Sequence, residues 1–240
     1  ILLIYILGIY FLLTKMMQLE DEAVVGVKKT HKGLSETTHS SNEKAIQYVA
    51  SNMIKEAPKI AITFDDGPSP AWTPKLLDRL KERNVKATFF LIGENAENTP
   101  ELVKRESEEG HLVGNHTYHH VEITRVPDET AKEEILMTNE VITGITGEEV
   151  SYMRPPFGAW QKKLEWELDV MPVMWTIDPL DWTTNNEDEI VNKVVTQAKE
   201  NDIILLHDCY ESSVNAALRI VDILQKEGFE FVTVDELIMN

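Results

Sequence analysis

The chain has a single cysteine, few basic side chains and no glycine-rich phosphate loop. One cysteine (Cys209) among 240 residues excludes an internal disulfide framework and any metal site made of several thiolates. Lys and Arg number 23 against 41 Asp and Glu, a formal net charge of −18, and so acidic a chain argues against nucleic acid as a partner. The lack of a G-x-G-x-x-G or P-loop pattern disfavours nucleotide cofactors. A composition that is 42% hydrophobic and 27% charged is typical of a globular protein and excludes collagen-like and wholly disordered chains.

Long hydrophobic runs are also scarce, and the one present opens the chain. Ile1–Leu13 carries no charge. It is shorter than the roughly 20 residues that a membrane-spanning helix needs, and its length suits the core of a signal peptide. No A-x-A-like cleavage site follows, which favours an uncleaved anchor, and the first residue is Ile rather than Met. We therefore expect an exported protein at the cell surface, either anchored through residues 1–17 or secreted after cleavage.

The charge is unevenly distributed along the chain. Residues 1–57 hold six basic and six acidic side chains, so the whole charge of −18 falls on residues 58–240. A helix is predicted over Glu43–Glu56, with Asn42 as its cap, inside an otherwise polar linker. The sequence thus predicts three parts: an apolar signal or anchor segment (1–17), a tether (18–57) and one catalytic domain (58–240).

In the third part, short β-rich runs alternate with amphipathic helical patterns. The predicted strands are nearly continuous apolar runs, as expected when both faces of a parallel sheet are covered. They are Lys59–Phe64, Ala87–Ile92, Leu112–Gly114, Val150–Met153, Pro172–Ile177, Ile203–Leu206 and Phe229–Val234. The predicted helices are Pro74–Glu82, Pro100–Glu109, Glu129–Ile142, Glu187–Lys199 and Val214–Lys226. This alternation favours an α/β fold of the (β/α) barrel type with seven strands, and an open doubly wound sheet is the second choice.

In such a barrel, the carboxyl ends of the strands are where chemistry gathers. Asp65 and Asp66 follow the first predicted strand. They are either part of a plain turn or a pair in which one carboxylate binds a metal and the other acts as a base. His116 and His120 follow the third strand and can converge on one ion. His119 is the poorer candidate because a neighbouring side chain tends to point elsewhere. Together these residues predict two imidazoles and one carboxylate around a metal.

Three further strand ends carry polar groups. Arg154 begins a proline-stiffened turn after the fourth strand and is suited to holding a carboxylate ionised. Asp178 and Asp181 follow the fifth strand, and His207 ends the sixth. Each signal alone has a structural explanation, as a turn or as a satisfied core histidine. Five such signals at the same end of one fold are improbable by chance, and this coincidence favours an active site.

These segments resemble the five signature motifs of the polysaccharide deacetylases, known as carbohydrate esterase family 4 or the NodB-homology domain. The motifs are Thr63–Pro68, His116–His120, Arg154–Gly158, Asp178–Trp182 and Leu205–Asp208. The resemblance covers about residues 58–240, including the closing Gly228–Val234 stretch. It implies a distorted (β/α)7 barrel, which agrees with the seven strands predicted from the pattern.

The resemblance implies metal-dependent hydrolysis. Asp66, His116 and His120 would bind a divalent metal, usually Zn²⁺, with Co²⁺ or another divalent ion as alternatives. Asp65 would be the catalytic base that takes the proton of the attacking water, and Arg154 would hold Asp65 in place.

The resemblance also implies an acid side and a substrate pocket. His207 would protonate the departing amine, and Asp181 would tune His207. The backbone N–H of Phe157 would stabilise the oxyanion. Trp182 and Leu205 would form the wall of the pocket for the acetyl methyl group.

The implied reaction removes N-acetyl groups from N-acetylglucosamine-type residues of a cell-wall or extracellular polysaccharide, foremost peptidoglycan, and releases acetate. Chitin-type oligomers and muramic acid residues are alternative substrates, and a non-catalytic wall-binding relic is an alternative function. Non-haem iron oxygenases also use two histidines and one carboxylate, but they do not need Asp65, Arg154 or His207. We expect a monomer whose partners are the polysaccharide and, through an uncleaved residue 1–17 segment, the membrane.

Overall fold

The computed structural model describes residues 56–166 and 168–239. The predicted apolar segment, the tether and its helix lie outside the described residues, apart from the last two positions of the tether. In these two described ranges, no helix is both long and apolar enough to cross a membrane.

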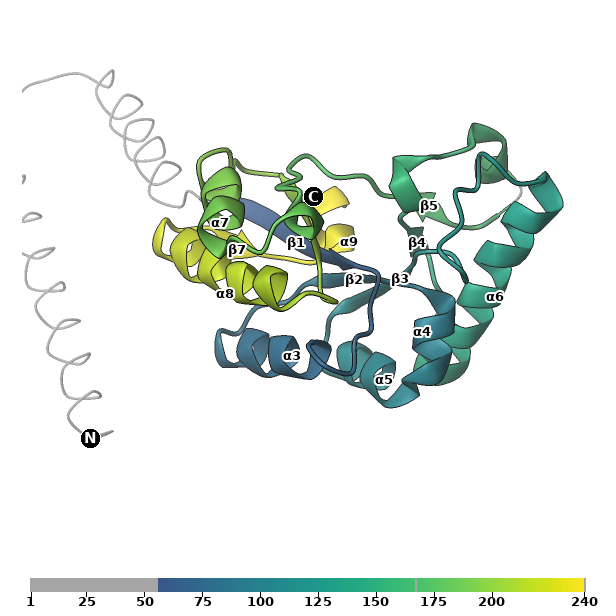
Figure 1. The fold of residues 1–240 in the computed structure, drawn as a ribbon, viewed down its shortest axis with the longest axis horizontal. Helices are drawn as coiled ribbons and strands as arrows, with labels where there is room; N and C mark the ends of the chain where they lie inside the picture. The colour runs from purple at the N-terminus through teal and green to yellow at the C-terminus, as the bar shows by residue number, and fades with distance from the viewer. Residues whose placement is uncertain (1–55, 167, 240) are drawn as a thin grey trace, which may run out of the picture. The chain divides into compact units, whose positions relative to one another are not determined.

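A parallel sheet curled into an incomplete barrel forms the centre of the described part of the chain (Figure 1). Its strands are β1 (Lys59–Asp65), β2 (Thr88–Leu91), β3 (Leu112–Asn115), β4 (Tyr152–Met153), β5 (Met171–Pro172), β6 (Ile203–His207) and β7 (Glu230–Phe231). Their order is β5-β4-β3-β2-β1-β6, with β7 also paired to β1, and every pairing is parallel. Consecutive strands are neighbours from β1 to β5, as in a barrel, so the predicted barrel class is confirmed over the doubly wound sheet.

Helices cover the outer face of this sheet. They are α3 (Thr73–Glu82), α4 (Gly93–Asn98), α5 (Pro100–Glu108), α6 (Asp128–Thr146), α7 (Glu187–Val195) and α8 (Glu211–Lys226), whereas α9 (Val234–Ile238) packs with interior residues of the barrel. Around the barrel, α7 packs on α8, α8 on α3, α3 on α5 and α5 on α6 (Figure 1). Helices α4 and α9 were not predicted from the sequence, because helices of 6 and 5 residues are too short to show a helical period.

Side chains along β1 point alternately to the apolar core outside the sheet and to the barrel interior. The side chains at even positions from Ile60 to Phe64 pack in the core cluster that includes residues of α3 and α8. The side chains at odd positions, Ala61, Thr63 and Asp65, face the barrel interior because successive strand residues point to opposite faces. The polar residues of this inner row lie toward the carboxyl end of β1, where the site was predicted.

The predicted strand Pro172–Ile177 is wrong in its extent, since β5 ends at Pro172. The carbonyls of Val173 and Met174 accept hydrogen bonds from the Arg154 guanidinium, at 3.1 and 3.2 Å, instead of from a neighbouring strand. Backbone hydrogen bonding to β6 resumes at Thr176, and Ile177 forms an isolated parallel bridge to Ile204 of β6. The barrel therefore closes through an arginine side chain and one bridge rather than through a continuous ladder.

The last predicted strand, Phe229–Val234, is also shorter in the structure. Thr233 caps α9, in a capping box with Glu236, so the chain turns into a helix directly after β7. Val234 and Leu237 of α9 pack with interior residues of the barrel such as Phe90. This helix thereby fills the apolar end of the barrel, opposite the polar one.

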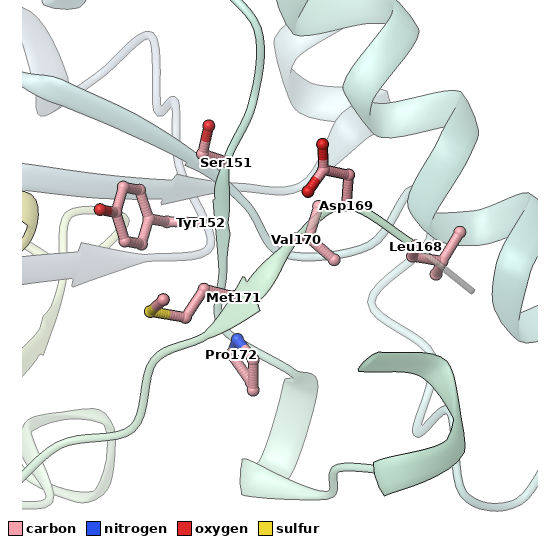
Figure 2. Close-up of a pocket in the computed structure, with 7 residues that line it drawn as sticks. All are labelled: Ser151, Tyr152, Leu168, Asp169, Val170, Met171 and Pro172. Carbon is pink, nitrogen blue, oxygen red and sulfur yellow. The ribbon is translucent and has the colours of Figure 1, made fainter. Parts of the chain in front are cut away.

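A cavity of about 400 Å³ lies at the outer edge of the sheet, beside β4 and β5 (Figure 2). It is lined by Ser151, Tyr152, Leu168, Asp169, Val170, Met171 and Pro172. None of these residues belongs to the predicted site, which has a cavity of its own.

Candidate active site

A second cavity, of about 410 Å³, opens at the carboxyl ends of the strands. Its lining residues are Asp65, Asp66, His116, His120, Pro155, Phe157, Trp175, Asp178, Trp182, Leu205, His207 and Tyr210. It therefore brings together every predicted site residue except Arg154 and Asp181. These two are buried and hydrogen-bonded to cavity-lining side chains. The predicted convergence of the strand ends is thus present in the geometry.

Three potential metal ligands meet in this cavity. Asp66 Oδ1 lies 3.3 Å from His116 Nε2 and 3.4 Å from His120 Nε2. The three ligand atoms all lie within 4.8 Å of one another, and they form the only such group of His, Cys, Asp or Glu among the described residues. Asp66 Oδ1 is buried and has no hydrogen-bond partner in the described part of the chain. An unpaired buried carboxylate oxygen facing two imidazoles is an arrangement that a cation would satisfy.

The spacing of these atoms fits a small divalent ion. Zinc binds imidazole nitrogen and carboxylate oxygen at about 2.0–2.2 Å, and two ligands of a tetrahedral ion at that range lie about 3.4 Å apart. His116 Nδ1 lies 2.6 Å from the carbonyl oxygen of Arg154, so its Nδ1–H donates there and its Nε2 is left as the acceptor. The donor set of this chain is therefore suited to the metal that the family resemblance implies.

The charges of the triad match the requirements of a metal ligand set. Burial by itself would raise the pKa of Asp66, but the adjacent imidazole of His116, with smaller contributions from His207 and His120, outweighs burial and lowers that pKa. Burial also lowers the pKa of His120 against the opposing effect of Asp66. A carboxylate and a neutral imidazole are the forms that bind metals.

The backbone around the ligands is held in an unusual conformation. Asp66, Thr117 and His120 have φ angles of 71°, 62° and 56°, in the left-handed region. Such a conformation costs about 1–3 kcal/mol for a residue other than glycine and persists only where the surroundings over-determine it. The loop is therefore fixed by its neighbours rather than by its own preference.

Asp65 lies beside the triad and is paired with a buried arginine. Arg154 Nη1 donates to Asp65 Oδ1 at 2.8 Å and to Thr63 Oγ1 at 2.6 Å. The side chains of Arg154 and Asp65 are 0% and 4% exposed. The other oxygen, Asp65 Oδ2, lies 3.9 Å from His116 Nε2 and so faces the triad. Arg154 thus leaves one carboxylate oxygen of Asp65 available in the cavity.

His207 lies on the other side of the triad and is held by Asp181. Its Nδ1 lies 2.8 Å from Asp181 Oδ1, and its backbone N–H donates to Asp181 Oδ2 at 2.9 Å. Its Nε2 lies 4.0 Å from Asp66 Oδ2. Burial lowers the pKa of His207, but the hydrogen bond and charge of Asp181, with smaller contributions from Asp65 and Asp66, raise it overall to about 9. His207 is therefore a cation at neutral pH.

The mouth of the cavity is aromatic. Phe157 and Trp182 are 68% and 56% exposed although they are large apolar side chains, and Tyr210 is 41% exposed. Phe157 has a φ of 62° and packs edge-on against the ring of His120. Leu205 lies on the inner row of β6 and is buried in the wall. Exposed aromatic faces around a polar centre suit a ligand with flat apolar surfaces and polar edges, such as a sugar.

His119 and Cys209 lie outside this arrangement. His119 points away from the triad, and its Nδ1 lies 2.7 Å from Glu134 Oε1. Burial, with the charges of Asp66 and Asp208, raises the pKa of the Cys209 thiol to about 12, so the thiol stays protonated. Neither side chain is among those that line the cavity.

Several supporting residues were missed from the sequence. Thr63 binds the buried arginine, Glu134 binds the loop between the two histidine ligands, and Tyr210 lines the mouth. Glu134 comes from α6 and meets the loop only in the folded chain. Thr63 belongs to the Thr63–Pro68 motif. Its position two residues before Asp65 on the same predicted strand could have indicated that both side chains face the barrel interior. Tyr210 carried no signal beyond its position three residues after His207.

Comparisons with known proteins agree with this geometry. The sequence profile described as polysaccharide deacetylase matches residues 52–173. Over 186 residues the chain is 40% identical to a peptidoglycan-N-acetylglucosamine deacetylase of Bacillus cereus, covering 75% of this chain and 68% of that protein. It is 38% identical over 217 residues to the peptidoglycan-N-acetylglucosamine deacetylase PgdA of Listeria monocytogenes, covering 88% of this chain but 46% of the relative. The chain thus spans about half the length of that relative.

The fold agrees with a solved structure. The peptidoglycan deacetylase PdaC from Bacillus subtilis aligns with a TM-score of 0.74 and 38% sequence identity, covering 76% of this chain and 90% of that one. Among curated sequences, PdaC is described as a peptidoglycan-N-acetylmuramic acid deacetylase, and it is 39% identical to this chain over 178 residues, 74% of this chain and 38% of PdaC. The relatives therefore include proteins named for each of the two sugars of peptidoglycan.

Proposed function

The chain belongs to the polysaccharide deacetylase family, and on that premise we propose that it removes N-acetyl groups from N-acetylglucosamine residues of peptidoglycan. The observation that carries the proposal is the convergence of one metal-binding triad with a paired base and a paired acid on a single cavity. The reaction would cleave the amide C–N bond, adding OH to the acyl carbon and H to the nitrogen. Its products would be acetate and a glucosamine residue.

In this proposal the Asp66, His116 and His120 side chains hold a divalent metal, with zinc as the first choice and Co²⁺ or another divalent ion as alternatives. The metal would supply Lewis acidity toward the acetyl carbonyl and the attacking water. The unpaired Asp66 Oδ1 and the Nε2 atoms of both histidines are the atoms assigned to it.

Asp65 takes the proton from the attacking water. Its Oδ1 is occupied by Arg154, while its Oδ2 faces the triad. A positioned base of this kind contributes about 10²–10⁴-fold to a rate. The role of Arg154 is to hold the Asp65 carboxylate in one orientation and to balance its charge inside the barrel.

His207 protonates the departing amine. Its protonated state at neutral pH follows from Asp181, and its Nε2 faces the triad. The backbone N–H of Phe157 is assigned to the oxyanion of the tetrahedral intermediate. Trp182 and Leu205 are assigned to the pocket that receives the acetyl methyl group.

The proposed setting is the cell surface. A polymer of the cell wall is reached only by an exported protein, and the apolar 1–17 segment supports export with or without anchoring. We retain the division into segment (1–17), tether (18–57) and catalytic domain (58–240), and a monomer as the active form.

The test is acetate release from intact peptidoglycan by the purified chain. Asp65→Asn should lower the rate by about 10²–10⁴-fold because the base is lost. His116→Ala and excess chelator should each abolish the rate and the binding of metal. Asp169→Asn is the matched control, because this exposed carboxylate lies at the other cavity (Figure 2) and its loss should leave the rate unchanged. Full activity of Asp65→Asn would refute the assignment of the site.

The second candidate substrate is the N-acetylmuramic acid residue, which the name of PdaC favours. Enzymatic digestion of treated peptidoglycan followed by mass spectrometry separates glucosamine from muramic acid products. Glucosamine alone supports the first proposal, and muramic acid alone replaces it with the second. Activity confined to chito-oligosaccharides would move the substrate outside the wall. Binding to the wall without acetate release would indicate the non-catalytic relic.

A further inference from the structure

We propose that Glu134, on α6, is a positioning residue that fixes the His116–His120 loop and thereby sets the affinity of the triad for its metal. The inference rests on the proposed metal site and adds a residue that does not line the cavity. Glu134 lies in none of the five signature motifs and stands 14 residues after His120 in the chain.

The carboxylate of Glu134 makes three contacts with the loop between the two histidine ligands. Its Oε2 accepts from the backbone N–H of Tyr118 at 3.0 Å and of His119 at 2.8 Å. Its Oε1 lies 2.7 Å from His119 Nδ1. The side chain of Glu134 is 9% exposed, whereas that of His119 is 53% exposed. The nearly buried carboxylate of Glu134 thus binds this short loop through both of its oxygens.

The loop needs such support because its backbone is strained on both sides of these contacts. Thr117 and His120 have positive φ angles, and a β-branched residue such as Thr is disfavoured there. The direction in which His120 leaves the loop depends on that backbone. A loop freed to relax would move His120 Nε2 away from Asp66 Oδ1, to which it now lies at 3.4 Å.

The other hydrogen bonds made by the backbone of Thr117 and Tyr118 come from groups that cannot replace Glu134. The carbonyls of Thr117 and Tyr118 accept from the N–H groups of Gly93 and Glu94, at the start of α4. The N–H of Thr117 donates to the Asn115 side chain at 2.7 Å. These contacts hold the carbonyl side of the loop and its first amide. The amides of residues 118 and 119 depend on Glu134.

The chemistry predicts what each substitution would change. Groups that orient metal ligands from outside typically contribute about 10–100-fold to metal affinity. Glu134→Gln keeps an oxygen that can accept from both amides, so it should bind metal within about threefold of the wild type. Glu134→Ala removes the acceptor and should weaken metal binding by about 10–100-fold. Glu134→Asp keeps the charge but withdraws the carboxylate by one methylene, and it should weaken binding by about tenfold.

The experiment measures the dissociation constants of Zn²⁺ and Co²⁺ by competition with a chromogenic chelator, on the full chain and at constant pH. Glu133→Gln is the matched control, because Glu133 is the exposed neighbour on the same helix, and its affinity should equal that of the wild type. Deacetylation by Glu134→Ala should recover when the metal concentration is raised, with an unchanged KM for the polymer. A merely structural role would lower thermal stability without this dependence on metal.

Metal affinity of folded Glu134→Ala within threefold of the wild type would overturn the inference. If that variant does not fold, Glu134→Asp decides, and wild-type affinity there would overturn the inference equally. His116→Ala separates this failure from that of the proposed function. If the wild type binds no metal, or His116→Ala binds as tightly as the wild type, the metal site itself falls. If His116→Ala loses metal affinity but the Glu134 variants bind metal as tightly as the wild type, the metal site is correct and Glu134 does not affect its affinity.

Discussion

The two charged pairs beside the triad differ in how their charge is maintained. Asp65 is paired with Arg154, whose guanidinium is charged around neutral pH although burial lowers its pKa. Asp181 is paired with His207, an imidazole that titrates with a pKa of about 9. The proposed base is therefore paired with a permanent charge, while the proposed acid carries the titration that we expect to limit the reaction at high pH.

The positions of the two pairs explain the difference. Arg154 crosses the barrel interior and also binds the carbonyls of Val173 and Met174, where the sheet lacks a ladder. His207 ends β6 at the cavity, and its side chain is 13% exposed. Breaking the first pair should therefore damage fold and activity together. Breaking the second should change the pH dependence and leave the fold largely intact.

The largest effect is expected for Arg154→Met. This change leaves the buried Asp65 carboxylate without its cation, and removing one partner of a buried ion pair costs about 3–5 kcal/mol. Urea unfolding measures the loss, and acetate release should disappear with it. Arg83→Met is the control, since its pair with Asp222 is partly exposed and should contribute about 1 kcal/mol or less. Equal losses in the two variants would contradict the distinction between buried and exposed pairs.

An intermediate effect is expected at His111, a buried imidazole without a carboxylate partner of the kind that His207 has. Its Nδ1 accepts from the Ala87 N–H, and burial, with the charge of Lys86, lowers its pKa to about 4. The stability that it contributes is complete above pH 6.5 and is lost as the pH falls toward 4. Between pH 7.5 and pH 5, the free energy of unfolding of His111→Asn should therefore fall by roughly 2 kcal/mol less than that of the wild type. Parallel stability curves would refute this account.

The smallest of these effects is expected for Asp181→Asn. Without the carboxylate, the pKa of His207 falls from about 9 toward its usual value, and the protonated form declines at a lower pH. The fall of kcat/KM at alkaline pH should therefore begin at a lower pH than in the wild type. We expect kcat/KM to be roughly tenfold lower at pH 8 and little changed at pH 6. Arg154→Lys serves as the comparison, because it should change kcat/KM without changing the pH at which kcat/KM falls. If kcat/KM of Asp181→Asn falls at the same alkaline pH as that of the wild type, His207 is not the titrating acid.

Much of the fold could be predicted because its signals are local. Strands β1, β2, β3 and β6 were predicted within two residues at either end, since each is a short run of mostly apolar residues. The predictions failed at β5 and β7, where the pattern of apolar residues continues but the backbone bonds do not. At β5 the carbonyls bind Arg154, and after β7 a threonine cap starts α9. Both outcomes depend on contacts distant in sequence.

The amino-acid sequence by itself determined which chemical groups the site could contain. Two adjacent carboxylates, a pair of histidines and an arginine each follow an apolar run, and strand periodicity sends them to one end of a parallel sheet. These are properties of residue type and local spacing. They were sufficient to identify the family and to name candidates for the metal, the base and the acid.

Only the tertiary structure decided how those groups act on one another. The 2.8 Å contacts of Arg154 with Asp65 and of Asp181 with His207 join residues 89 and 26 positions apart. The support of the histidine loop by Glu134 likewise depends on where α6 packs. Burial and charge pairing set the protonation of a side chain, and both arise from neighbours that are remote in the chain. The physical reason is that electrostatic and hydrogen-bond energies depend on distance in space, which the order of residues does not contain.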